Sequence, residues 1–233
     1  MKINITFIIT LSFFFTILYN CNKPSIIKFE NTIFDFGEVY EGSDINYTYI
    51  FKNTGTKPVT IRHVQPSCVC LTILGWDNTV EPGETGEIPV TFKTPNLNGD
   101  IIKYINVKTG ILKEEHQSIK LIFKGRVVIP IEIVPKNPWL GDVTHETRYL
   151  SGSFKIKNNL DTPLRILKVT PPDNKTQYKL TTIEENKQYS LDYIMYPPFE
   201  GDKTVEKKFI LLTDNEEYEY VELKLFLFIV QPL

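Results

Sequence analysis

Residues 34–72 read FDFGEVYEGSDINYTYIFKNTGTKPVTIRHVQPSCVCLT, and the architecture of the whole chain follows from the pattern in this stretch. Over residues 45–52, aromatic and β-branched side chains recur at every second position, which is typical of a half-buried strand. The Asn-Thr-Gly sequence at 53–55 contains residue types that tolerate a positive φ, so we expect the chain to turn back there. Residues 58–64 then form the expected returning strand.

The same order of strands and turns returns about a hundred residues later, which indicates two copies of one module. The matching segments are Leu140-Gly141-Asp142-Val143 with Phe36-Gly37-Glu38-Val39, residues 154–158 with 49–53, and residues 163–166 with 58–61. The second copy has Pro172-Asp173-Asn174 where the first has Ser67-Cys68-Val69. We therefore expect the fold to form without the cysteines.

Elsewhere the sequence predicts short strands at regular spacing with turn residues between them, and no long segment repeats its apolar residues with the period of a helix. This pattern favours an all-β antiparallel sandwich. The apolar residues between the two copies predict that the last strand of one runs nearly straight into the first strand of the next, because flexible linkers are polar or rich in Gly and Ser. We expect a signal peptide at 1–20, a tether at 21–28, a first sandwich at 29–129 and a second at 130–233.

Four motifs of the first copy resemble those of a bacterial domain family of unknown function. They are Phe36-Gly37-Glu38-Val39, Phe51-Lys52-Asn53-Thr54-Gly55, Pro58-Val59-Thr60-Ile61, and the Ser-Cys-x-Cys motif at 67–70. The resemblance implies a Hydin (ASH-like) immunoglobulin-type fold, hence two tandem immunoglobulin-like antiparallel β-sandwiches, in an exported protein or lipoprotein. The family usually carries Ser-Cys-Gly-Cys-Thr; here Val69 replaces the glycine and Leu71 is inserted before Thr72.

The composition argues against a nucleic-acid partner and leaves other kinds of partner open. The chain has 233 residues, a formal net charge of −2 and 42% hydrophobic residues, so it can bury a core. A near-neutral charge provides no electrostatic footprint for nucleic acid.

The first twenty residues resemble an export signal. Lys2 is the only charge and precedes a nearly continuous apolar segment, which is typical of a secretory signal peptide. An uncleaved membrane anchor is the alternative, because the segment is close to the shortest that can span a bilayer. Leu18-Tyr19-Asn20-Cys21 resembles a bacterial lipoprotein cleavage box, although Tyr19 and Asn20 are larger than the usual residues there. We therefore predict lipidation at Cys21, a lipid anchor to the membrane, and a periplasmic, outer-membrane or cell-surface location in a bacterium.

Cys68 and Cys70 are the chemically distinctive residues of the first copy, and they follow a predicted strand directly. Loops after strands often display functional groups. If Cys21 is lipidated, the other two cysteines form an even pair in an exported protein, which favours a disulfide or a bound metal over free thiols. Copper or zinc could be held with His63 as a third ligand, or the pair could do thiol redox work.

The sequence contains no phosphate-binding loop, nucleophile motif or zinc-ligand spacing, so no catalytic residue is assigned. We therefore expect a non-enzymatic binding or scaffolding protein of the cell envelope, whose partner is an unidentified protein or envelope component. The alternative is metal handling (Cu or Zn) or thiol redox chemistry at Cys68 and Cys70.

Overall fold

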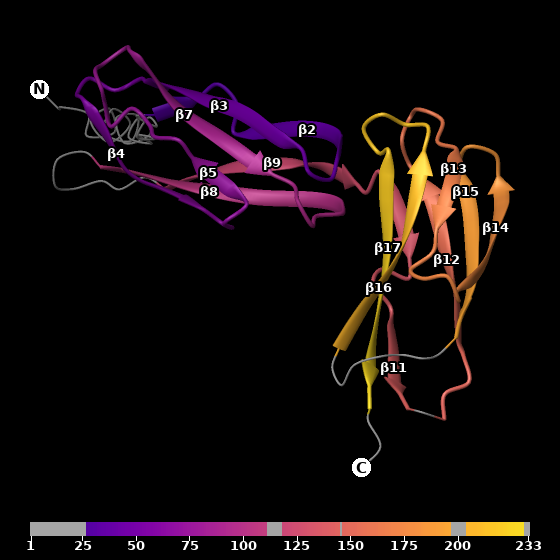
Figure 1. Ribbon diagram of the computed structural model, residues 1–233. Coiled ribbons are helices and arrows are strands. Elements are labelled where there is room, and N and C mark those ends of the chain that lie inside the picture. Colours follow the sequence, from indigo (N-terminus) through magenta and orange to yellow (C-terminus); the bar gives the residue numbers. More distant parts are fainter. Residues whose placement is uncertain (1–26, 111–117, 145, 197–203, 231–233) are drawn as a thin grey trace, which may run out of the picture. The chain divides into compact units, whose positions relative to one another are not determined.

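A computed structural model describes residues 27–110, 118–144, 146–196 and 204–230 (Figure 1). These residues form strands, turns and loops without a helix, as the sequence predicts. The chain divides into two compact units, Met1–Arg126 and Val127–Leu233, and each unit contains two β-sheets. The fold is therefore two tandem immunoglobulin-like β-sandwiches.

The first module is built from a four-stranded sheet, β1-β3-β7-β5, and a five-stranded sheet, β2-β9-β8-β4-β6. Its strands are β1 (Ile27–Phe29), β2 (Ile33–Tyr40), β3 (Asp44–Asn53), β4 (Val59–Pro66), β5 (Leu71–Ile73), β6 (Thr79–Val80), β7 (Thr85–Lys93), β8 (Gly99–Gly110) and β9 (Ser118–Val128). Strand β1 starts at Ile27, inside the segment 21–28 expected to be a tether, because Ile27 and Phe29 are buried in the core.

The second module is built from the sheets β10-β12-β15-β14 and β11-β17-β16-β13. Its strands are β10 (Ile131–Val134), β11 (Trp139–Val143), β12 (Leu150–Asn158), β13 (Ile166–Thr170), β14 (Gln177–Glu184), β15 (Gln188–Met195), β16 (Thr204–Thr213) and β17 (Tyr220–Ile229). The pairing of β11 with β17 is parallel, in an otherwise antiparallel arrangement. Two residues separate β9 from β10 in the sequence.

The chain turns after β3 and returns as β4, as expected, but the two strands do not pair with each other. Strand β3 pairs with β1 and β7, whereas β4 pairs with β6 and β8 in the opposite sheet. None of the residues at 53–55 has a positive φ. The alternation in the sequence locates both strands but does not say which sheet each one joins.

The side chain of Asn53 shapes the connection from β3 to β4. Its Nδ2 donates hydrogen bonds to the carbonyls of Lys57 and Val80, both at 2.9 Å, and its Oδ1 accepts one from the Gly55 amide at 2.9 Å. The residue is completely buried. The turn is therefore stabilised by hydrogen bonds of the Asn53 side chain, and it does not use the positive φ that the sequence suggested.

Asn158 repeats this arrangement in the second module. Its Nδ2 donates to the carbonyls of Thr162 (2.8 Å) and Asn186 (3.0 Å), and its Oδ1 accepts from the Leu160 amide (2.9 Å). The repeat found in the sequence is thus a repeat of side-chain hydrogen bonding as well as of strand order.

Each module has its own apolar interior. In the first, Phe92 packs against both Phe36 and Phe123, and the Tyr49 hydroxyl of β3 donates to the carbonyl of Ile122 on β9 at 2.8 Å, which ties the two sheets together. The second has a continuous cluster of buried residues that includes Phe154, Leu191, Phe209 and Leu223.

Candidate functional site

The Cys68–Cys70 pair lies in the loop by which the chain passes from one sheet to the other. Strand β4 ends at Pro66 in the five-stranded sheet, and β5 begins at Leu71 in the four-stranded sheet. The two sulfurs are joined in a disulfide, with a Cα–Cα distance of 5.2 Å. The bridge therefore closes the 67–70 loop, defined as Ser67 to Cys70, around a single residue.

Backbone hydrogen bonds fix this loop at both ends. The Ser67 amide donates to the Tyr104 carbonyl at 2.8 Å, and the Tyr104 amide donates to Ser67 Oγ at 3.0 Å, so the first end is attached to β8. At the second end the Lys93 amide of β7 donates to the Cys70 carbonyl at 2.9 Å. The disulfide thus links a segment held by one sheet to a segment held by the other.

Val69 stands at the tip of the 67–70 loop. Its relative exposure is 102%, so none of its side chain is covered, while both cysteines are half-buried. The dihedral angle φ is not positive at Val69. The loop therefore accommodates a valine where the resembling family usually has glycine, and it presents that apolar side chain to solvent.

His63 lies on β4, exposed, and pairs in register with Lys108 of β8. Arg62, on the same strand, is also exposed. On β9, which lies on the other side of β8, the ammonium group of Lys120 lies 3.8 Å from the ring centre of Tyr104. In the described parts of the chain, no three His, Cys, Asp or Glu side chains are grouped so that they could hold a metal ion. The predicted ligand set of His63 with the cysteines stays a prediction.

The second module makes the corresponding passage between sheets, from β13 to β14, with a carboxylate in place of a disulfide. Asp173 Oδ1 accepts hydrogen bonds from the amides of Lys175 (3.1 Å) and Thr176 (2.9 Å) and from the Thr176 hydroxyl (2.7 Å). Its Oδ2 pairs with Lys207 Nζ at 3.3 Å. Burial opposes ionisation of Asp173, but the bonds from Thr176 and Lys207 outweigh it and hold its pKa below the ordinary value.

The remaining predicted site residue, Cys21, lies with the signal segment outside the described residues. Within the described residues, no helix is both long enough and apolar enough to cross a membrane.

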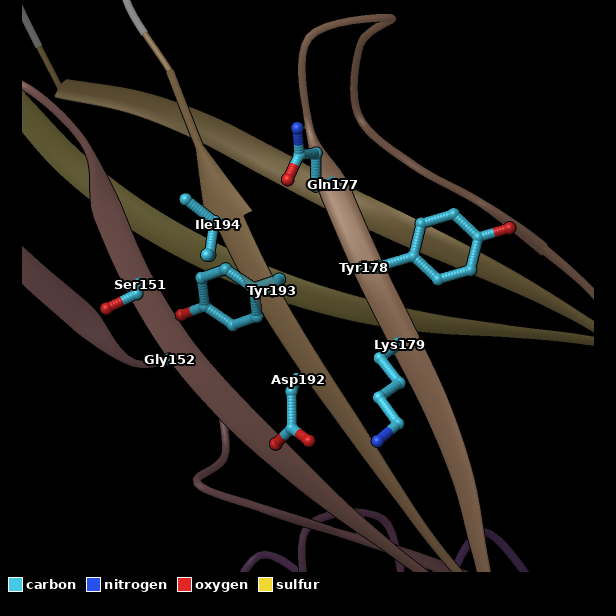
Figure 2. A pocket seen from close by; sticks show the side chains of 8 residues that line it. All are labelled: Ser151, Gly152, Gln177, Tyr178, Lys179, Asp192, Tyr193 and Ile194. Carbon is cyan, nitrogen blue, oxygen red and sulfur yellow. The ribbon is translucent and has the colours of Figure 1, made fainter.

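A second candidate site, which sequence reasoning missed, is a groove of about 450 Å³ over β12, β14 and β15 of the second module (Figure 2). Its lining residues are Ser151, Gly152, Gln177, Tyr178, Lys179, Asp192, Tyr193 and Ile194. They come from three strands. Tyr178 and Tyr193, which lie in register with Gly152, point into the sandwich, whereas the other side chains lie on the outer face of the sheet. The signal in the sequence was a single glycine inside a strand, which often marks a close approach.

Fold and loop together define a tandem immunoglobulin-like protein with a disulfide-closed loop in its first module. Residues 27–127 match the family model described as "Protein of unknown function (DUF1573)". The resemblance of the first copy to a bacterial family of unknown function is thereby confirmed. No curated protein matches the chain.

Several solved structures are similar to the chain. A protein of unknown function from Porphyromonas gingivalis W83 is 11% identical, with a TM-score of 0.39 over 88% of this chain and 100% of that one. An ASH/PapD-like domain of human CEP192 is 17% identical, with a TM-score of 0.41 over 47% of this chain and 92% of that domain. The periplasmic chaperone SfaE is 13% identical, with a TM-score of 0.35 over 88% of this chain and 100% of the chaperone.

Proposed function

We propose that this chain is a non-enzymatic binding or scaffolding protein of a bacterial envelope, held to the membrane by a lipid on Cys21. The observation that carries the proposal is the 67–70 loop, a fixed apolar tip displayed at the crossover between two sheets. The partner that this loop fits is another protein with an apolar recess.

A fully exposed valine is a source of binding free energy. Burying a side chain of this kind is worth about 1.5–3 kcal/mol. The disulfide and the backbone hydrogen bonds to Tyr104 and Lys93 already fix the tip, so little conformational entropy is lost on association. The 67–70 loop is therefore suited to a contact in which Val69 is the central buried residue.

The location in the envelope rests on the sequence and on the bonded cysteine pair. Residues 1–20 resemble a signal peptide and Cys21 ends a lipoprotein-like box. A disulfide between Cys68 and Cys70 fits an oxidising compartment, because thiols inside the cytosol are kept reduced.

A photo-crosslinking amino acid tests the loop contact. Placed at position 69 of the full chain in its host, it should give an adduct of defined size after illumination. The matched control is the same amino acid at Asn174, an exposed position in the corresponding loop of the second module. Equal adducts from the two positions, or none from position 69, would contradict the proposal.

The lipid anchor is tested separately. Wild-type protein should incorporate a labelled palmitate probe and sediment with membranes, whereas Cys21→Ser should do neither. Label on the variant, or wild-type protein in the soluble fraction, would refute the anchor and leave the loop contact standing.

The second candidate function is thiol–disulfide exchange at Cys68 and Cys70. The observation that favours it is that the bridge encloses one residue at an exposed tip, while the second module makes its passage without cysteines. Val69→Asp should abolish a docking contact and leave exchange intact, whereas Cys70→Ser should abolish exchange. The metal form of this hypothesis stays a prediction.

A further inference from the structure

Strand β14 is a long edge strand that pairs on one side only. It lies at the end of the sheet β10-β12-β15-β14, beyond β15 (Figure 1), and β15 is its single partner among the described strands. Seven of its eight residues are exposed. An open edge of this kind presents a row of unpaired backbone N–H and C=O groups, to which another strand can add.

The hydrogen-bond pattern of the sheet identifies which backbone groups of β14 face the open edge. The Asn158 amide donates to the Lys187 carbonyl at 2.8 Å, so these two residues form a hydrogen-bonded position between β12 and β15. Such positions alternate along an antiparallel pair, and following the register from β12 through β15 to β14 gives the direction of each group. The amides and carbonyls of Tyr178, Leu180 and Thr182 point away from β15, and among the described residues they have no backbone partner.

The other edge strands of the described chain are short or irregular, which is one way in which natural sheets avoid adding a strand. Strands β1, β5, β6, β10, β11 and β13 have no more than five residues each. Strand β2 is as long as β14, but Gly37 in its middle has a φ of 70° and donates its amide to the Asp35 side chain. In β14 the register shifts only between Thr182 and Glu184, so residues 177–182 form a regular edge.

Two copies of β14 are complementary when they run antiparallel about Leu180. In that register Leu180 faces its counterpart and Tyr178 faces Thr182, so all three free backbone positions of each strand are paired. These side chains lie on the core side of the sheet, where Leu180 packs against the buried cluster. On the outer face Lys179 meets Thr181, so no like charges are opposed. Centring the pair on Lys179 would set two lysines against each other, which is unfavourable.

Exposed apolar side chains gather at the same edge of the second module. Tyr178 and Ile183 of β14 are 42% and 58% exposed, and Leu167, in the neighbouring β13, is 59% exposed. The Tyr178 hydroxyl donates to the Val169 carbonyl of β13 at 3.1 Å, so β13 and β14 lie together at this edge of the sandwich. A strand added to β14 would therefore cover apolar surface as well as backbone groups, and burial of apolar surface favours association.

We propose that this chain forms a two-fold dimer in which β14 pairs with β14 of a second copy, so that one sheet continues through both molecules. A single strand pair is a small contact, and the expected dissociation constant is on the order of 10–100 μM. Strand β14 belongs to the second module and the 67–70 loop to the first. The dimer is therefore independent of the proposed loop contact, and either proposal can fail alone.

Sedimentation equilibrium of the full chain from about 1 μM to 1 mM tests the association. A reversible equilibrium between monomer and dimer is expected across this range. Amide hydrogen exchange followed by NMR then locates the contact. Protection of Tyr178, Leu180 and Thr182 should rise with the dimer fraction, because their amides gain partners. The amides of Lys179 and Thr181 already face β15, so their protection should change far less.

Substitutions of opposite charge at Thr181 test the register. Thr181 is exposed and meets Lys179 of the second copy twice in each dimer. Thr181→Lys should therefore weaken association about three- to tenfold, and Thr181→Glu should strengthen it. Ser151→Lys is the matched control, because Ser151 is exposed on the same face but lies on β12, two strands from the edge. It should leave the dissociation constant unchanged.

Three results would overturn the proposal. The first is a chain that stays monomeric at every concentration, which would leave the β14 edge to a strand of another protein. The second is a dimer that does not protect the amides of Tyr178, Leu180 and Thr182. The third is a Thr181→Lys variant that associates as tightly as Ser151→Lys.

Discussion

At the scale of single residues, one buried asparagine in each module shapes the chain where it leaves a strand, Asn53 at the end of β3 and Asn158 at the end of β12. Asn53 is fully buried and Asn158 is 2% exposed, and each uses both ends of its amide to hold three backbone groups. A buried backbone group that loses its partner costs free energy, because no water replaces the bond. The asparagines are therefore structural residues.

Asn53→Ala should lower the free energy of unfolding of the first module by about 2–4 kcal/mol, because three net hydrogen bonds are lost. The measurement is a urea titration of the full chain, followed by NMR signals assigned to each module. Signals of the second module should keep their midpoint. Asn46→Ala is the control, since Asn46 makes an exposed bond to Thr91 and should cost far less; equal losses would refute this account of Asn53.

Asp173 should make the stability of the second module depend on pH. Its pKa is lowered in the folded state, so its contribution is fully present above the ordinary aspartate pKa and is lost as the pH falls through the lower folded value. Asp173→Asn should therefore cost about 1 kcal/mol at neutral pH, and the difference from wild type should shrink below about pH 4. Denaturant unfolding at several pH values measures this. A difference that grows on acidification would contradict the assignment.

At the scale of elements, the two modules solve one topological problem in two ways. In each module the chain passes from one sheet to the other through a loop. A disulfide closes this loop in the first module, and hydrogen bonds to Asp173 hold it in the second. The flanking strands pair alike in both modules: β4 pairs with β8 and β5 with β7 in the first, as β13 pairs with β16 and β14 with β15 in the second. The cysteines are therefore an addition to the module and are not part of its core.

Cys68→Ser with Cys70→Ser should cost the first module only about 1–2 kcal/mol, because a bridge around one residue removes little entropy from the unfolded chain. Thermal melting with and without reductant measures the effect. Reductant should lower the melting temperature of wild type to that of the double variant and leave the variant unchanged. Failure of the double variant to fold would show that the bridge is required.

How far the sequence predicts these elements depends on what each signal encodes. Alternation identified β3 and the repeat identified its counterpart β12, because side-chain period is local information. The sheet joined by β4 was not predicted, since alternation is the same in either sheet. The groove was not predicted either, because Gly152 and Tyr193 meet through cross-strand register. The hydrogen bonds of Asn53 were not predicted, because an Asn-Thr-Gly sequence is equally typical of a turn with a positive φ, which this turn does not use.

At the scale of the whole molecule, the chain is two copies of one sandwich, each with its own pair of sheets. The cluster around Phe154 and Phe209 is drawn entirely from the second copy, and the aromatic contacts around Phe92 and Phe123 lie within the first. The 67–70 loop lies on the first module and the groove over β12, β14 and β15 lies on the second.

The most direct measurement is the unfolding of the separate modules. Residues 27–129 and residues 130–233, each produced alone, should show a single cooperative urea transition. Their midpoints should lie close to those of the same modules in the full chain. If either fragment lacks a cooperative transition, the chain is not two self-sufficient sandwiches.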